Sequence, residues 1–192
     1  MAWIIGNSTP KLLLAETDFI GPLNGVKGEL GDTSLCVYGP AGPGWDSYEA
    51  LLARSGDDCA TRGGDMALPV TLVYTSGTTG KPKGAVLTQN NVFYNAINSA
   101  HVHNFSSEDH TLICIPMFHV GGLHIQATPI LHAGGTVTLH RKFDPAAMLR
   151  DLEERRPTHT LSVPAVLQAV MALPRWKDAD LSSLKLLMTG SS

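Results

Sequence analysis

The stretch VYTSGTTGKPKGAVLTQNN (residues 73–91) contains the segment of the chain that is richest in flexible and in hydroxyl-bearing residues. Ten of the twelve positions in 73–84 are threonine, serine, glycine, proline or lysine. The run follows an apolar segment and precedes a segment with helical character. Glycines let a backbone approach a ligand closely, and hydroxyl, N–H and lysine groups bind anions. The composition therefore predicts a phosphate-binding loop that follows a strand.

This loop differs from the common P-loop of nucleotide hydrolases, whose pattern is G-x-x-x-x-G-K-[ST]. Here Gly80 and Lys81 are followed by Pro82, and Thr75 stands where the first glycine is required. The other interpretation is a flexible surface hairpin rich in turn residues. Two lysines and four hydroxyls within the ten residues 75–84 favour anion binding over that alternative.

Composition and charge limit the class of protein. A chain of 192 residues with 43% hydrophobic and 16% charged residues is typical of a globular protein with an apolar core. A formal net charge of −3 gives no reason to expect nucleic acid or an anionic membrane as a partner. The three cysteines are odd in number and widely spaced, which favours a reducing compartment. We find no signal peptide and no apolar run of the roughly 20 residues that a membrane span needs, and we expect a cytoplasmic protein.

Short β-branched runs alternate with segments of helical spacing along the chain. Strands are expected within residues 11–16, 34–39, 70–76, 110–116, 135–140, 159–164 and 184–192. Helices are expected at 45–56 with Asp46 as N-cap, at 90–102, at 144–156 with Asp144 as N-cap, and at 164–176. This alternation predicts an α/β fold with largely parallel sheets and flanking helices.

The loop also resembles a known signature. Residues 74–91 are similar to the phosphate loop of the adenylate-forming superfamily, which includes acyl-CoA and aryl-CoA ligases, luciferases and peptide-synthetase adenylation domains. A second segment, IPMFHVGGL (residues 115–123), resembles the family's P-[ML]-[FY]-H motif. GGTVTLHRKFDP (residues 134–145) and LKLLMTGSS (residues 184–192) extend the similarity over nearly the whole chain. The resemblance is to the acyl- and aryl-CoA ligase branch.

The resemblance implies an enzyme that joins a hydrophobic carboxylate, a fatty or aryl acid, to AMP and passes the acyl group to coenzyme A. ATP, Mg²⁺ and coenzyme A are the implied cofactor and co-substrates, and Thr75 is the implied hydroxyl ligand of the metal. The role of holding the ATP phosphates then falls on Thr75, Ser76, Gly77, Thr78, Thr79, Gly80 and Lys83. Lys81 occupies a variable position of the family motif and is given less weight.

Four further residues take implied roles from the same resemblance. His119 matches the histidine beside the reacting carboxylate, Gly121 and Gly122 match the wall of the acyl pocket, and Lys142 matches a contact to coenzyme A. Taken alone, His119 would be a satisfied core histidine and Lys142 a solvated side chain. A metal site at the paired histidines is disfavoured, because no cysteine or carboxylate lies beside them at ligand spacing.

Both ends of the sequence lack the appearance of a closed domain. We therefore expect residues 1–192 to be an internal part of the large N-terminal, AMP-binding domain, without the C-terminal lid domain. Such a piece alone is expected to be inactive and to self-associate through exposed strand edges. The alternative function is a non-catalytic nucleotide- or pantetheine-binding module.

Overall fold

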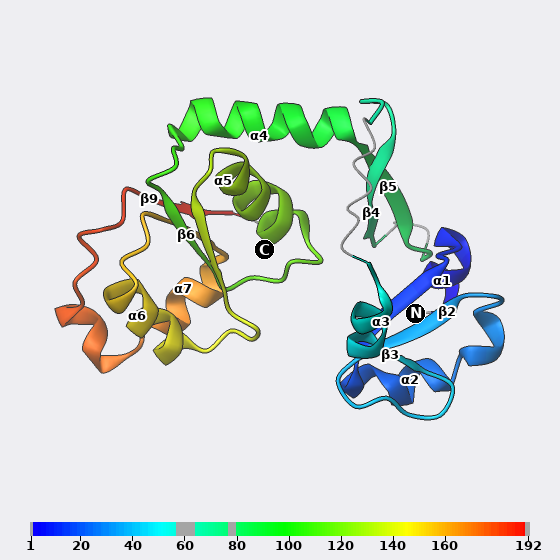
Figure 1. Cartoon of the computed structure of the whole chain (residues 1–192). Helices are drawn as coiled ribbons and strands as arrows, with labels where there is room; N and C mark the ends of the chain where they lie inside the picture. Colours follow the sequence, from blue (N-terminus) through cyan, green and yellow to red (C-terminus); the bar gives the residue numbers. More distant parts are fainter. Residues whose placement is uncertain (1, 57–63, 77–79, 191–192) are drawn as a thin grey trace. The chain divides into compact units, whose positions relative to one another are not determined.

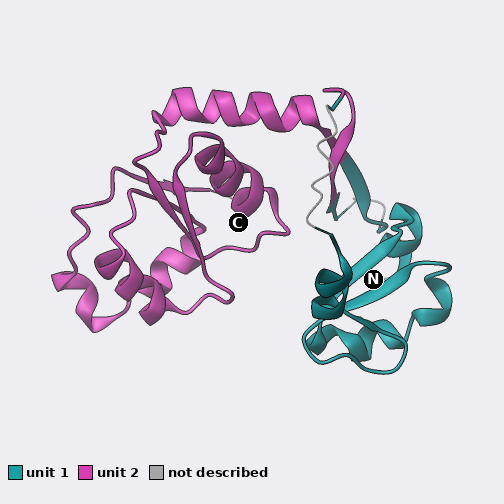
Figure 2. Ribbon diagram, in the orientation of Figure 1, with its two compact units in different colours: residues 1–64, 74–85 teal, residues 65–73, 86–192 magenta. Residues whose placement is uncertain are grey.

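The structure, a computed structural model, describes residues 2–56, 64–76 and 80–190. These residues fall into two compact units (Figure 2). Unit 1 lies within residues 1–64 and 74–85, and unit 2 lies within residues 65–73 and 86–192.

Unit 1 is built on a three-stranded parallel sheet in the order β1-β2-β3 (Figure 1). Its strands are β1 (Leu12–Glu16), β2 (Ser34–Tyr38) and β3 (Asp46–Ser47). Its helices are α1 (Ala2–Ser8), α2 (Ile20–Asn24) and α3 (Tyr48–Arg54), with 3-10 turns at Thr17–Phe19 and Lys27–Glu29. Its core consists of Ile5, Leu23, Leu30, Leu35, Val37 and Trp45.

A hairpin of β4 (Pro69–Thr75) and β5 (Lys83–Thr88) flanks the glycine-rich loop. Helix α4 (Gln89–His103) follows β5 directly. Thr88 and Asn91 close a reciprocal capping box at its first turn, which satisfies backbone donors that would otherwise lack partners. The strand and helix after the loop are thus joined without an intervening linker.

Unit 2 contains a four-stranded parallel sheet in the order β7-β6-β8-β9. The strands are β6 (His110–Ile113), β7 (Thr136–Leu139), β8 (His159–Ser162) and β9 (Leu186–Thr189). The connections carry a π-helix (Gly121–Ala127), α5 (Thr128–His132), α6 (Pro145–Glu154), α7 (Pro164–Met171) and a 3-10 turn (Pro174–Asp178).

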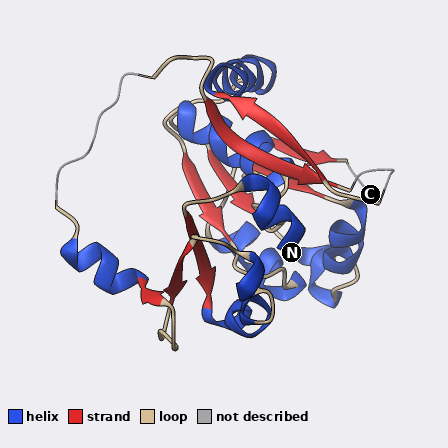
Figure 3. Cartoon of the chain, turned by 90° about the vertical axis from the view of Figure 1, so that its right-hand side faces the viewer, coloured by secondary structure: helices blue, strands red, loops and turns tan. Residues whose placement is uncertain are grey.

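Helices α5 on one side and α6 and α7 on the other cover this sheet (Figure 1), and Figure 3 shows the helices and strands of the chain in a second view. On one face Leu112 and Cys114 of the β6 segment pack with α6 and α7. On the other face Ile113 and Ile115 pack with Ala127 of the π-helix. The central strands β6 and β8 are buried on both faces, as expected of a parallel sheet.

The strand order places a topological switch between β6 and β8. The chain leaves β6 for β7 on one side, and leaves β8 for β9 on the other. In open α/β sheets, ligands bind outside the carboxyl ends of the strands at such a switch. The fold alone therefore points to the carboxyl ends of β6 and β8.

The predicted fold class is confirmed, and most predicted elements are present. The expected N-cap Asp144 accepts a hydrogen bond from the N–H of Ala147 at 2.7 Å. The expected N-cap Asp46 was wrong: Ser47 caps α3, because the short strand β3 takes up Asp46. The helix expected at 164–176 ends at Met171, since Leu173 is extended and Pro174 follows it.

A buried carboxylate ties the amino-terminal edge of the unit 2 sheet together. Asp109 is 1% exposed and lies 2.7 Å from Lys185 Nζ, just before β9. Its carboxylate also accepts hydrogen bonds from the N–H and hydroxyl of Ser106. Burial alone would raise the pKa of Asp109, but the bonds from Lys185, Ser106 and Thr158 outweigh it and lower the pKa to about 2.

We predict that Lys185→Met lowers the free energy of unfolding by about 1–3 kcal/mol at pH 7, because it leaves a buried carboxylate short of a partner. The pKa of Asp109 is lower in the folded chain than the ordinary 3.8, so its stabilisation is present above pH 4 and is lost as the pH falls toward 2. The deficit of the variant should therefore shrink at pH 3. Urea titrations at pH 7 and pH 3 measure it, with the exposed Lys177→Met as control. An equal deficit at both pH values would contradict this role.

Candidate functional site

A cavity of about 640 Å³ opens at the carboxyl ends of β6, β8 and β9. This volume lies within the usual range for small-molecule sites, about 300–1,000 Å³. Its walls come from the segment after β6, the π-helix, the β7–α6 connection, α7 and the end of β9. The lining residues are Cys114, Ile115, Pro116, Phe118, His119, Gly121, Ile125, Phe143, Leu161, Val163, Val166, Met188, Thr189 and Gly190.

The P-M-F-H segment forms the turn that follows β6. The N–H of His119 donates to the carbonyl of Pro116 at 3.3 Å, and Phe118 is 86% exposed. His119 Nδ1 accepts the N–H of Gly121 at 3.1 Å. With Nδ1 accepting, the neutral ring carries its proton on Nε2. His119 is exposed, so it lies at the rim of the cavity as a hydrogen-bond donor.

A π-helix, Gly121–Ala127, carries two of the cavity residues, Gly121 and Ile125. The buried amide of Gln126 fixes it against the sheet. Gln126 Oε1 accepts from Thr111 Oγ1 at 3.1 Å and from the N–H of Leu161 at 2.8 Å. This side chain therefore bridges β6 and β8 beside the cavity. Short π-helical turns are often found at functional sites.

The two predicted pocket glycines lie in different surroundings. Gly121 lines the cavity, and a Cβ there would lie 3.2 Å from Ile115 Cδ1. Gly122 is not among the lining residues, and a Cβ there would lie 2.6 Å from the carbonyl oxygen of Pro116. A side chain at Gly121 would thus crowd Ile115 and His119, whereas Gly122 lets the π-helix pack on the P-M-F-H turn.

Among the described residues of the predicted phosphate loop, Thr75 ends β4 and Lys83 begins β5. Thr75 Oγ1 donates to the carbonyl of Lys83 at 3.5 Å between these two strand ends. Thr75, Ser76, Gly80 and Lys83 are all exposed. Gly80 has φ +81°, a backbone conformation that side chains disfavour. Gly77, Thr78 and Thr79 lie outside the described residues.

Lys142, the predicted coenzyme A contact, is exposed in the connection between β7 and α6. Its own side chain is not part of the cavity wall, whereas the next residue, Phe143, is. The structure brings His119, Gly121 and Phe143 to one cavity.

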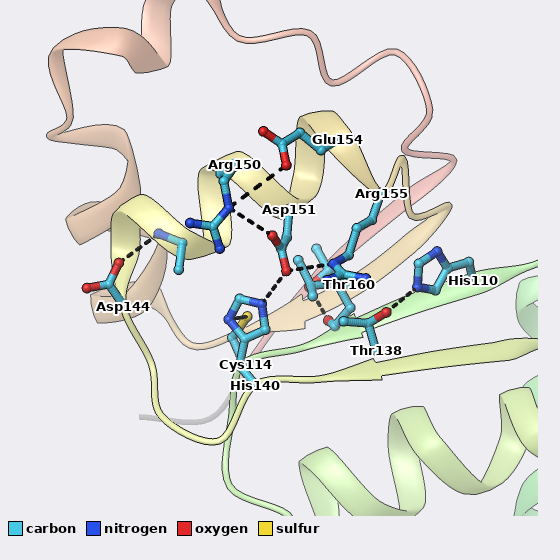
Figure 4. Close-up of polar contacts among 12 residues, drawn as sticks. His110, Cys114, Thr138, His140, Asp144, Arg150, Asp151, Glu154, Arg155 and Thr160 are labelled. Carbon is cyan, nitrogen blue, oxygen red and sulfur yellow. Dashed lines mark hydrogen bonds and ion pairs between the residues drawn. The ribbon is translucent and has the colours of Figure 1, made fainter.

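A buried polar network beside the cavity was missed at the sequence level (Figure 4). Cys114 lines the cavity and contacts His140, which in turn contacts Asp151 of α6. The available signal was Asp151 itself, a carboxylate between the core residues Leu149 and Leu152. Across residues 2–56, 64–76 and 80–190, no group of three histidine, cysteine, aspartate or glutamate side chains is arranged to hold a metal ion.

A model of the family described as "AMP-binding enzyme" matches residues 1–192. The chain belongs to this family. The family assignment agrees with the resemblance found in the phosphate-loop and P-M-F-H motifs.

Individual relatives are CoA ligases. The chain is 44% identical to an indoleacetate–CoA ligase of Aromatoleum aromaticum, over 98% of this chain and 37% of that protein. It is 45% identical to a feruloyl-CoA synthase of an Amycolatopsis species, over 63% of this chain and 25% of that one. Among solved structures, ATP-bound MatB from Rhodopseudomonas palustris matches all of this chain and 37% of its own, with a TM-score of 0.84 and 26% identity. The matched part of this chain thus covers between 25% and 37% of the length of these proteins.

No helix in the described part of the chain is both long and apolar enough to cross a membrane.

We predict that Gly122→Ala destabilises unit 2, because the added methyl would meet the backbone of Pro116 rather than a movable side chain. Overpacking of this kind typically costs about 1–3 kcal/mol. The measurement is the free energy of unfolding. Gly28→Ala is the control, since a Cβ at Gly28 meets no atom within 4 Å. Equal stability of the two variants would refute the close approach.

Proposed function

We propose that the chain carries the acid-binding and phosphate-binding parts of an AMP-forming acyl- or aryl-CoA ligase. In that reaction a carboxylate oxygen attacks the α-phosphorus of ATP and pyrophosphate leaves. The thiol of coenzyme A then attacks the acyl carbon and AMP leaves. The observation that carries the proposal is the apolar cavity at the β6/β8 switch with His119 at its rim.

The walls of the cavity favour a hydrophobic acid. Among its described lining residues there is no aspartate, glutamate, lysine or arginine, so the ammonium group of an amino acid would find no counter-ion there. Phe118 and Phe143 offer aromatic surface, which favours stacking with a ring. The relatives named for indoleacetate and ferulate support the aryl end of the substrate class.

His119 is suited to hold the reacting carboxylate. Because its Nδ1 accepts the N–H of Gly121, its Nε2–H is free to donate to a carboxylate or acyl oxygen. The same bond orients the ring, so the donor is positioned before substrate arrives. A donor fixed in advance costs no reorganisation when charge develops on that oxygen.

The hairpin loop would hold the phosphates of ATP. Thr75 and Ser76 offer exposed hydroxyls, and Lys83 offers a cation for the pyrophosphate that leaves. Gly77, Thr78, Thr79 and Gly80 complete the loop in sequence. Mg²⁺ would neutralise phosphate charge, with the Thr75 hydroxyl as a hard oxygen ligand and the remaining ligands supplied by phosphates and water. Lys142 would contact coenzyme A from the β7–α6 connection.

We predict that the full-length protein exchanges pyrophosphate into ATP when an aryl or fatty acid is supplied. The reason is the uncharged apolar wall of the cavity. Isotope exchange with arylacetates, cinnamates, fatty acids and amino acids measures it. Exchange that depends on amino acids alone would exclude the proposed ligase branch.

We predict that Lys83→Ala and Thr79→Ala slow adenylate formation in the full-length protein by tens-fold or more, the order expected when one transition-state donor is lost. Thioester formation from a supplied acyl-adenylate should change much less, because pyrophosphate has already left. Lys81→Ala is the matched control, as an exposed lysine of the same loop at a variable position. Equal losses in both half-reactions would mean that the loop is structural.

A further inference from the structure

Beside the cavity, a thiol contacts an imidazole, and the imidazole contacts a carboxylate (Figure 4). Cys114 Sγ is 3.5 Å from His140 Nδ1, and His140 Nε2 is 2.9 Å from Asp151 Oδ2. Cys114 follows β6, His140 follows β7, and Asp151 lies on α6. The order nucleophile, base and orienting acid is that of base-activated nucleophiles on unrelated folds.

Asp151 fixes the tautomer of His140. Burial alone would raise the pKa of Asp151, but hydrogen bonds from His140, Arg155 and Arg150 outweigh it and lower the pKa. Arg155 Nε and Arg150 Nε lie 2.9 and 3.2 Å from its oxygens. The ionised carboxylate accepts a hydrogen bond from the Nε2–H of His140, so Nδ1 presents its lone pair to the thiol.

Cys114 is a free, buried cysteine, and it is one of the residues that line the cavity. Burial, and then the charge of Asp151, raises the pKa of Cys114 to about 12. A standing thiolate is therefore rare at neutral pH, and any reaction of this sulfur needs a base that takes the proton as the new bond forms. His140 Nδ1 is placed for that transfer.

We propose that Cys114 is a modification site, a base-assisted thiol that small carbon electrophiles entering the cavity alkylate. With iodoacetamide, a bond forms between Cys114 Sγ and the methylene carbon while the carbon–iodine bond breaks. Iodide leaves with the bonding pair, and the thiol proton passes to His140 Nδ1. The inference rests on the cavity and three side chains, and it does not depend on the ligase function.

Cys36 provides an internal reference within the same chain. It is free and as deeply buried as Cys114, on strand β2 of unit 1. No described histidine makes a hydrogen bond to it. Burial alone would leave both thiols inert, so a difference between them points to the cavity or to the base, and the His140 and Asp151 variants separate these two causes.

The test is timed alkylation of the native protein with iodoacetamide, followed by peptide mass spectrometry at each cysteine. Cys59, which lies outside the described residues, is replaced by serine in every sample. We expect Cys114 to react at least about ten times faster than Cys36. His140→Gln should slow Cys114 by roughly 100-fold, the low end of general-base effects, and Asp151→Asn should slow it by about 10-fold. The control is His110→Gln, which changes a histidine at the start of β6 that is hydrogen-bonded to Thr138. This variant should leave the alkylation rate of Cys114 unchanged.

Unfolding would expose the thiol and accelerate its alkylation, so a slower reaction in a variant cannot arise from misfolding. If Cys114 in the His140→Gln variant instead reacts at the rate measured for the protein unfolded in urea, that variant is unfolded. The Asp151→Asn variant then tests the proposal. The proposal is overturned if Cys114 in the unaltered protein reacts no faster than Cys36. It is also overturned if the folded His140 or Asp151 variant alkylates Cys114 at the unaltered rate.

Discussion

The side-chain amide of Gln126 is the contact on which the geometry of the cavity depends. Strands β6 and β8 pair at two positions, Thr111 with His159 and Leu112 with Thr160. Beyond that point the N–H of Leu161 donates to Gln126 Oε1. A buried backbone donor without a partner would cost about 1–3 kcal/mol. The Gln126 amide removes this cost, so the strands can separate at the cavity without leaving the N–H of Leu161 unpaired. Because Gln126 belongs to the π-helix, the same contact fixes Gly121 and Ile125 in the wall.

The opposite edge of the sheet is held by charge. Asp109 precedes β6, while its partner Lys185 precedes β9, so one ion pair connects the outer and inner strands at their amino ends. His159 lies beside this pair, with Phe105 edge-on to its ring at 4.8 Å. Asp109 is buried whereas the side chain of Lys185 is largely exposed, so the main cost of losing the lysine is a buried carboxylate left short of a partner. The amino-terminal edge of the sheet is thereby fixed.

Local patterns of the sequence predicted the fold well, and predicted the site less completely. The strands, the parallel arrangement and the Asp144 cap follow from β-branched runs, alternation and a Pro145 that begins a helix. The strand β5 was not predicted, because its glycine-rich start looks like a loop until β4 pairs with it. The π-helix was not predicted either, since two glycines at its start disfavour a helix and tertiary contacts such as those of Gln126 stabilise it. His119 and Gly121 were accessible through a motif, whereas the Cys114–His140–Asp151 contact joins three segments that no local pattern connects.

The distribution of polarity in the cavity determines how an acid would enter it. Moving a carboxylate into an apolar enclosure without partners is costly, whereas burying hydrocarbon contributes roughly 25 cal/mol per Å². Leu161, Val163 and Val166 form apolar wall, and the exposed His119 presents its Nε2–H at the rim. Under the proposed ligase function, an aryl or fatty acid would therefore enter with its hydrocarbon part first and keep its carboxylate beside His119. In that orientation the reacting oxygens would stay at the mouth of the cavity, accessible to a phosphate and then to a thiol, and the length of the cavity would limit the size of the hydrocarbon part.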